Sequence, residues 1–292
     1  MKLETSSISQ GFSPKALIHL LTYIGLAAFT YALVRQQIAF ALVIAMLPIG
    51  IAAIGYGLMH PRFIYLLYAT YAFFFTTISR YIHMNQLSAG LEAILTYGII
   101  AVIILSYYKK DSIKWSSAIN VLTLSYIPWM LFSLFQLSNP GTHSDGVFTG
   151  IRIWIFRTFF LYLFLSLLSN TSKTLRIGIN LIAFFTLLAF IKLLWQKYIG
   201  FDSAELYWLF VEGGARTHVI GSGIRYFSYF TDAANFGGFM ATAGLVFGII
   251  GFHEPKNIYK ISYLCIAVTA FIGMFISGTR GALVVPMIGL ML

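Results

Sequence analysis

The chain has 292 residues, of which 59% are hydrophobic and only 10% are charged. This composition excludes a water-soluble globular enzyme and a disordered chain, because 27 Phe and 18 Tyr give more apolar surface than either could keep away from water. The formal charge of +10 does not indicate nucleic-acid binding, since the basic residues stand singly between apolar runs. The one cysteine, Cys265, lies inside an apolar run, which excludes a disulfide framework and a thiolate metal site.

Apolar runs long enough to cross a bilayer, about 20 residues, fill the chain. Backbone groups in hydrocarbon must hydrogen-bond within their own segment, so the runs predict an all-α, polytopic transmembrane helical bundle. The nine predicted spans cover residues 15–34, 38–58, 62–79, 88–107, 115–137, 151–169, 176–196, 233–252 and 258–277.

The sequence at each end of the chain leads to a further expectation. A tenth apolar run starts at Gly281 and is too short to cross the bilayer before Leu292, so we expect residues 1–292 to form one transmembrane domain that is incomplete at its C-terminus. The polar N-terminal segment has no cleavable apolar stretch, so we expect the first run to remain as an anchor.

The types of the basic residues, more than their numbers, predict that the N-terminus is cytoplasmic. Lysines dominate the side that would then be cytoplasmic, whereas the opposite side and the buried positions are rich in arginine. Arginine's planar fork binds phosphate or carboxylate through two hydrogen bonds at once, so an anionic ligand is expected on the outer face. The alternative is that these side chains only reach lipid headgroups. The arginines concerned are Arg35, Arg80, Arg152, Arg157, Arg216, Arg225 and Arg280.

Residues 197–232 form the longest polar connection, which we expect on the outer side. Within it, Asp202 followed three residues later by Glu205 predicts a capped amphipathic helix, lying on the membrane with Trp208 at the interface. The second outer connection, residues 138–150, is rich in turn-forming residues and should be irregular.

Two motifs carry the candidate chemistry. In the first, GSGIRYF is followed by TDAANFGG, so that Arg225 stands among small and aromatic residues and Asp232 or Asn235 caps the next helix. In the second, FISGTRGALVV, glycines flank Arg280 in a tight turn at the outer boundary. A charged side chain beside hydrocarbon costs about 2.5 to 3.5 kcal/mol on insertion scales, which favours a functional role. Plain turns and a capped helix are the alternatives.

Embedded charges form a third group. Arg157 and Glu92 lie within their predicted spans near the outer side, and they either pair with each other or line a cavity. Lys192 is close enough to a helix end to reach the interface, which makes it a structural residue.

The histidines show no metal-ligand spacing, so no metal or other cofactor is expected. His218 is the one nearest the Arg225 motif, and we expect it to be solvated in its loop. Gly244 and Gly248 form a GxxxG pattern, which predicts a close helix contact.

These two motifs, Arg225 to Gly238 and Ser277 to Ala282, on a polytopic chain make the sequence resemble the bacterial O-antigen ligase and O-antigen polymerase superfamily. The hydropathy resemblance covers the whole chain, and the motifs cover about the last quarter. The resemblance implies a GT-C-like fold and a metal-independent, inverting glycosyltransferase of the inner membrane, acting at the periplasmic face. The implied donor is a glycan on undecaprenyl diphosphate, and the acceptor is lipid A core or another lipid-linked glycan.

The resemblance also assigns roles to residues. The arginines that engage the donor diphosphate map onto Arg225 and Arg280 as catalytic and substrate-binding residues, and the further substrate-binding candidates are Asp232, Asn235, Arg157 and Arg216. Two departures from the family pattern stand out. Ala233 and Ala234 lie where the family often has a proline before the asparagine, and the family's large periplasmic loop with its histidine would follow the tenth helix. The fragment alone is therefore expected to be inactive.

Two other functions remain open at this point. A transporter or flippase of lipid-linked sugars would use the same anionic handle without chemistry, although the chain shows no inverted repeat. A sensor or a purely structural membrane protein would need neither arginine.

Overall fold

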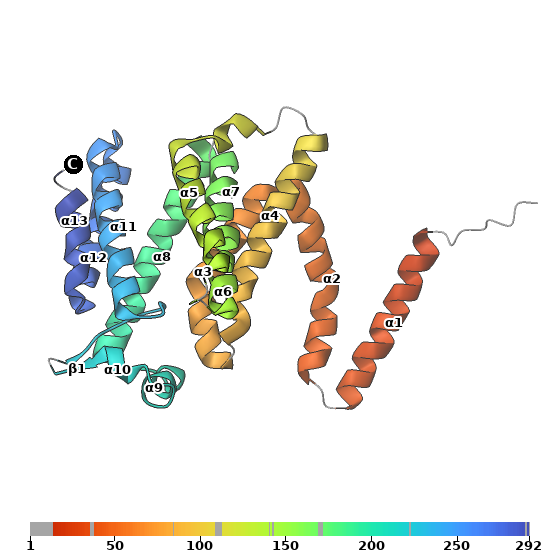
Figure 1. Ribbon diagram of the computed structural model, residues 1–292. Helices are drawn as coiled ribbons and strands as arrows, with labels where there is room; N and C mark the ends of the chain where they lie inside the picture. Colours follow the sequence, from red (N-terminus) through yellow and green to blue (C-terminus); the bar gives the residue numbers. More distant parts are fainter. Residues whose placement is uncertain are drawn as a thin grey trace, which may run out of the picture. The chain divides into compact units, whose positions relative to one another are not determined.

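The computed structural model consists mainly of helices (Figure 1). The chain divides into two compact units, Met1–Met59 and His60–Leu292. The first unit is a hairpin of two apolar helices, α1 (Pro14–Val34) and α2 (Ile38–Met59). The structure describes residues 14–35, 38–83, 85–108, 113–139, 141, 143–168, 172–221, 223–289 and 291.

The second unit holds the remaining elements. Its long helices are α3 (Pro61–Ile82), α4 (Ala89–Tyr108), α5 (Val121–Phe135), α8 (Ser172–Tyr198), α11 (Ala233–His253) and α12 (Asn257–Ile276). A further long helix consists of α6 (Ser144–Ile151), a π-helical segment (Arg152–Phe159) and α7 (Phe160–Leu168). The short elements are α9 (Ser203–Phe210), α10 (Ala215–His218), strands β1 (Val219–Ile220) and β2 (Gly223–Ile224), α13 (Val284–Gly289), and 3₁₀ turns at Asn85–Ser88, Trp115–Ala118, Gln136–Ser138 and Arg280–Leu283.

The apolar runs of the sequence correspond to helices, as predicted. In the described part of the chain, six helical segments are long and apolar enough to cross a membrane. Many of their large apolar side chains are exposed, among them Leu124, Ile191 and Val268. Such faces suit hydrocarbon as solvent, which is the pattern of a multi-pass membrane protein. The six segments are Ala89–Tyr108, Val121–Ser138, Asp145–Leu168, Ser172–Tyr198, Ala233–His253 and Asn257–Ile276.

The structure differs from the local predictions at three places. The connection at 138–150 is helical from Ser144 onward, with Asp145 in the first turn, where a carboxylate favours the positive end of the helix dipole. The predicted span at 115–137 becomes an α-helix only at Val121, because Asn120 and Thr123 form a reciprocal capping box there. The connection at 197–232 contains a small antiparallel pairing of β1 with β2, which the all-α expectation did not include.

The core of the second unit lies among α3, α8, α11 and α12. Phe73 of α3 stacks on Phe185 of α8 with ring centroids 4.3 Å apart, and Met240, Phe247 and Met274 are buried beside them. Apolar packing thus joins the helices that carry the candidate site residues.

Glycines bring α11 and α12 together at a spacing of seven residues. A Cβ added at Gly244 would lie 2.8 Å from the ring of Phe271, and one at Gly251 would lie 2.9 Å from Leu264. Gly237, seven residues before Gly244, faces the turn after α12 in the same way. The close contact expected from the GxxxG pattern is therefore confirmed for Gly244 but wrong for Gly248, whose added Cβ would meet nothing within 4 Å.

Replacing Gly244 and Gly248 with valine tests this packing with a matched pair. Gly244→Val inserts a side chain against Phe271 and should destabilise the protein by about 1 to 3 kcal/mol, the usual cost of overpacking. Gly248→Val places the same side chain in open space and should change stability little. Thermal unfolding of the purified protein in one detergent measures both, and equal losses would contradict the packing described.

Candidate functional site

The connection between α8 and α11 is an ordered layer at one end of the second unit. Figure 1 shows α9, α10 and the β1–β2 hairpin gathered where α8 ends and α11 begins. Its first helix starts as predicted: the Asp202 carboxylate accepts a hydrogen bond from the Glu205 N–H at 2.9 Å, and the Glu205 carboxylate accepts one from the Asp202 N–H at 3.0 Å. This capping box fixes the direction in which α9 leaves the end of α8.

An ion network fastens α9 to α8. The Lys192 ammonium lies 2.9 Å from the Asp202 carboxylate and 3.0 Å from that of Glu205. The Lys192 and Glu205 side chains are 14% and 4% exposed, so the prediction that Lys192 reaches the interface was wrong, although its role is structural. Burial alone would raise the pKa of Asp202, but hydrogen bonds from a backbone N–H, a tyrosine hydroxyl and the Lys192 ammonium lower it below its usual value.

Gln196 extends the network to the segment just before α11. Its amide nitrogen donates to the Glu205 carboxylate at 2.8 Å, and its amide oxygen accepts from the Ser228 N–H at 2.9 Å. Ser228 is fully buried, has a φ of 51° and donates its hydroxyl to the Ala189 carbonyl at 2.8 Å. A non-glycine residue in the left-handed region costs free energy, so this backbone shape is held by its hydrogen bonds to α8.

The last turn of α3 binds the same layer at three points. The Arg80 guanidinium donates to the carbonyls of Phe230 and Thr231, the latter at 3.2 Å. The Tyr81 hydroxyl donates to the Asp202 carboxylate at 2.7 Å, and His83 Nδ1 lies 3.0 Å from a Glu212 carboxylate oxygen. Neighbouring residues of one helix therefore position both the start and the end of the connection.

Arg80 is the candidate residue that the sequence alone did not single out. It is 4% exposed, and its guanidinium carbon lies 4.4 Å from the ring centroids of both Trp208 and Phe227, a cation–π arrangement. Its Nε and Nη1 are buried with no hydrogen-bond partner among the described residues. Trp208, expected at the membrane interface, packs against this guanidinium. The available signal was a charge in the last turn of an apolar helix.

His218 is buried, which contradicts the expectation of a solvated histidine. It is 2% exposed, and its Nε2 accepts the backbone N–H of Ala233, the first residue of α11, at 3.2 Å. Nδ1 therefore carries the proton and donates to the Gly214 carbonyl at 2.9 Å. Burial lowers the pKa of His218, with the positive charges of Arg80 and Arg225 acting in the same direction.

The start of α11 is capped as predicted. The Asp232 carboxylate accepts the Asn235 N–H at 2.7 Å, and the Asn235 side-chain amide donates back to Asp232 at 2.9 Å and to Thr231 Oγ1 at 2.6 Å. Both site candidates are thus engaged with each other at a helix N-terminus, where the dipole and free N–H groups favour an anion.

The two sequence motifs meet in space. A Cβ built on Gly278 would lie 3.4 Å from Cγ of Arg225, and the Thr279 hydroxyl donates to the Ala233 carbonyl at 2.8 Å. Gly278 has a φ of 74°, which turns the backbone sharply just before Arg280. Arg225 is half-buried, and its Nε has no hydrogen-bond partner in the described part of the chain. The Arg225 stem therefore rests on the turn that carries Arg280.

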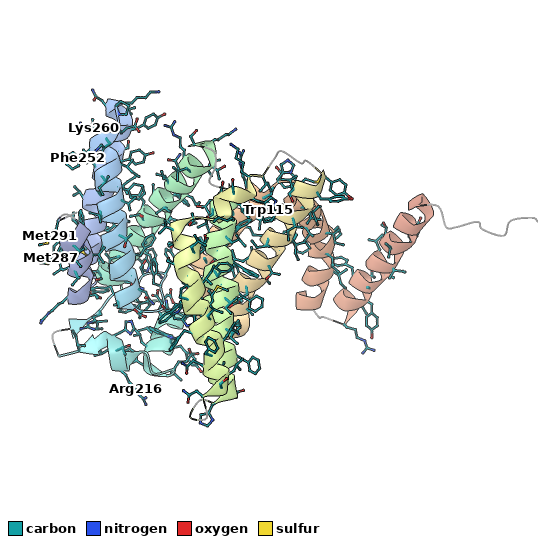
Figure 2. The ribbon with its side chains drawn as sticks, turned by 45° about the horizontal axis from the view of Figure 1, so that its top comes forward. Trp115, Arg216, Phe252, Lys260, Met287 and Met291 are labelled. Atoms are coloured by element: carbon teal, nitrogen blue, oxygen red, sulfur yellow. The ribbon has the colours of Figure 1, made fainter. Side chains whose placement is uncertain are left out.

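The side chains of the remaining arginine candidates do not form the contact between Arg225 and the Gly278 turn. Arg280 is exposed at the start of its 3₁₀ turn. Arg216 is also exposed, and Figure 2 shows its side chain directed away from the helices. Arg157 contacts Glu92 at 2.5 Å and the Ser88 carbonyl at 3.3 Å, so of the two expected arrangements the structure has the ion pair.

A π-helical segment explains how Glu92 binds two arginines. Arg152 Nε lies 3.3 Å from the same carboxylate oxygen that binds Arg157. The turns of a π-helix are wider than those of an α-helix, so residues five apart lie closer to one face, and both guanidinium groups reach the same carboxylate. Arg157 is therefore occupied by Glu92 in this arrangement.

No group of three or more His, Cys, Asp and Glu side chains that could hold a metal ion occurs among the described residues. Comparisons with protein-family models, with curated proteins and with solved structures find no match to this chain. The candidate site therefore rests on its geometry: Arg80, Arg225 and a capped helix N-terminus beside the turn of Arg280.

The pKa of His218 predicts a pH dependence of stability. Folding lowers this pKa below its ordinary 6.5, so the unfolded chain takes up the proton first as the pH falls. The contribution of His218 to the free energy of unfolding should be fully present above pH 6.5 and should be lost as the pH drops through the lowered pKa. The reason is that a protonated Nε2 can no longer accept the Ala233 N–H. His218→Gln should remove this decline, whereas the exposed His83→Gln should keep it. Thermal unfolding between pH 8 and 5 measures the slopes, and an unchanged slope in His218→Gln would contradict the assignment.

Proposed function

We propose that the protein is a metal-independent, inverting membrane glycosyltransferase that transfers or polymerises a glycan linked to undecaprenyl diphosphate. The single observation that carries this proposal is the contact of the Arg225 stem with Gly278 in the turn before Arg280. Two motifs separated by some fifty residues supply guanidinium groups to one end of the bundle. A lipid-linked diphosphate is the anion that suits arginines at the boundary of an apolar bundle.

The chemistry needs stabilisation of a leaving group. An acceptor hydroxyl oxygen attacks the anomeric carbon, the bond from that carbon to the diphosphate oxygen breaks, and its electron pair departs with the diphosphate. Positioned guanidinium groups stabilise the growing charge in a site of low dielectric constant. The hydroxyl proton goes to a base, and His218 is not assigned that role because its Nε2 already accepts the Ala233 N–H.

The proposed setting is the inner membrane of a bacterium, with a cytoplasmic N-terminus, nine complete spans in a GT-C-like bundle and the arginine layer at the periplasmic face. The division of lysine and arginine between the two sides supports this orientation. The acceptor is lipid A core for a ligase or a second lipid-linked glycan for a polymerase.

Alanine at Arg225 or Arg280 in the full-length protein should lower glycan transfer about 100-fold or more, as expected when a group that stabilises the leaving group is lost. Lysine at either position should restore only part of the rate, because the fork geometry is missing. Surface polysaccharide in cells, with the protein level measured alongside, reads out the effect. Lys197→Ala, which removes an exposed cation at the same end, is the matched control and should leave transfer unchanged. Normal polysaccharide from both arginine variants would refute the proposal.

Transfer of a labelled glycan between lipids by the purified full-length protein separates this function from transport. A flippase moves the lipid-linked sugar without making a new product, so a longer or newly attached glycan supports transfer. Movement of label across the liposome membrane with no new product would indicate transport and would contradict the glycosyltransferase proposal.

A further inference from the structure

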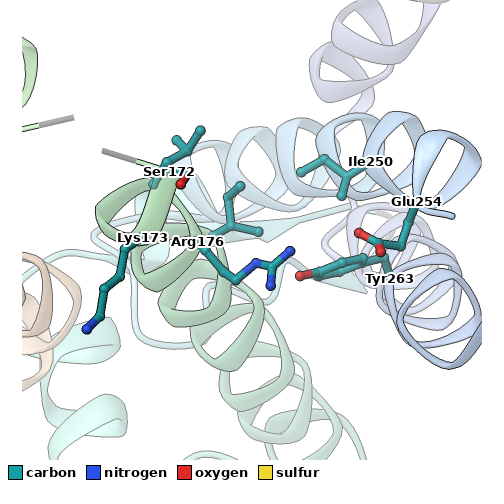
Figure 3. A pocket seen from close by; sticks show the side chains of 8 residues that line it. Ser172, Lys173, Arg176, Ile250, Glu254 and Tyr263 are labelled. Carbon is teal, nitrogen blue, oxygen red and sulfur yellow. The ribbon is translucent and has the colours of Figure 1, made fainter. Parts of the chain in front are cut away.

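A charged pocket lies at the end of the second unit remote from the arginine layer. It has a volume of about 540 Å³ and is formed by the start of α8, the end of α11 and the first turns of α12 (Figure 3). Its polar lining includes Lys173, Arg176, Glu254 and Tyr263, and Ile179 and Ile250 form part of its apolar wall. The volume is in the range of small-molecule sites, about 300 to 1,000 Å³.

The opposite charges in this pocket are not joined in ion pairs among the described residues. Within the described residues, no ion pair shorter than 4.0 Å joins Lys173 or Arg176 to a carboxylate, and none joins Glu254 to a cation. In Figure 3 the Arg176 guanidinium and the Tyr263 hydroxyl point toward one another, with Glu254 on the far side of the pocket from Lys173. Separated charges of both signs complement a ligand that carries both signs.

The Tyr263 hydroxyl is prepared to accept a hydrogen bond. Its proton is donated to Asn180 Oδ1 at 3.2 Å, which leaves lone pairs on the phenolic oxygen. Together with the Glu254 carboxylate, this oxygen offers acceptors to a primary ammonium group. Lys173 and Arg176 offer donors to a phosphate.

The apolar wall and the position of the pocket indicate a lipid. Ile179 and Ile250 lie on α8 and α11, two of the helices apolar enough to cross a membrane, and the charged lining residues lie at or near the helix ends. This is the level at which headgroups meet acyl chains. A fully anionic headgroup would face the Glu254 carboxylate without compensation, which favours a zwitterionic one.

We propose that this pocket binds the headgroup of an aminophospholipid, with the phosphate held by Lys173 and Arg176 and the primary ammonium held by Glu254 and Tyr263. The apolar wall receives the first carbons of the acyl chains. This inference requires only that the bundle spans a membrane, and it is independent of the proposed glycan transfer.

Native mass spectrometry of the full-length protein tests the proposal. The protein is released from nanodiscs that contain equal amounts of phosphatidylethanolamine, phosphatidylcholine and phosphatidylglycerol, and the retained lipids are counted. Phosphatidylcholine has the same charges but no N–H donor, so it separates hydrogen bonding from charge. Arg176→Gln and Glu254→Gln remove one charge of each sign. Lys256→Gln removes an exposed cation close to Glu254 that does not line the pocket.

The expected result is about tenfold preferred retention of phosphatidylethanolamine, lost by about tenfold in both pocket variants and kept in Lys256→Gln, since one charged hydrogen bond is of this size. The Glu254→Gln variant distinguishes a zwitterionic headgroup from an acidic one. If Glu254→Gln increases retention of phosphatidylglycerol and the wild-type protein does not prefer phosphatidylethanolamine, the pocket takes acidic lipids and the proposal is wrong. Equal retention of the three lipids would also overturn it. Equal melting temperatures of the variants in phosphatidylcholine exclude misfolding as the cause of a loss.

Discussion

The buried carboxylate of Glu205 is the group on which the arrangement of the candidate site depends. A charge that is 4% exposed is tolerable only where it is paired and hydrogen-bonded, and here Lys192 and Gln196 of α8 satisfy it. The same Gln196 holds the segment at Ser228, so the connection is tied to α8 both before and after the hairpin. The position of Arg225 follows from these ties, because only two residues separate it from Ser228.

The sequence was informative where the controlling contacts are local. Apolar runs predicted the helices, and the spacing of Asp202 to Glu205 and the TDAAN segment predicted two helix starts that the structure confirms. It was uninformative where a side chain meets a partner far along the chain. His218 looked solvated because nothing nearby in sequence encloses it. Arg80 could not be distinguished from the six other arginines expected on the outer side or at buried positions, because its carbonyl partners lie some 150 residues away.

The two ends of the second unit present different chemistry. At one end, beside a helix N-terminus, buried guanidinium nitrogens of Arg80 and Arg225 have no hydrogen-bond partner among the described residues. At the other, Arg176 and Glu254 line a common pocket, and neither forms an ion pair in the part of the chain that the structure describes. The helices between these two ends are apolar enough for hydrocarbon.

Disulfide trapping between positions 225 and 278 tests the central claim. The claim is that the connection between α8 and α11, held in place by Glu205 and Gln196, positions Arg225 on the turn of the second motif. In a Cys265→Ala background, a sulfur at position 225 takes the place of a Cγ that lies 3.4 Å from a Cβ at position 278. The account predicts rapid cross-linking of Arg225→Cys with Gly278→Cys, slowed by Glu205→Gln but not by Asp145→Asn, which changes an exposed carboxylate of α6 outside the connection. Absence of the cross-link in the otherwise unaltered protein, or equal rates with and without Glu205→Gln, would contradict it.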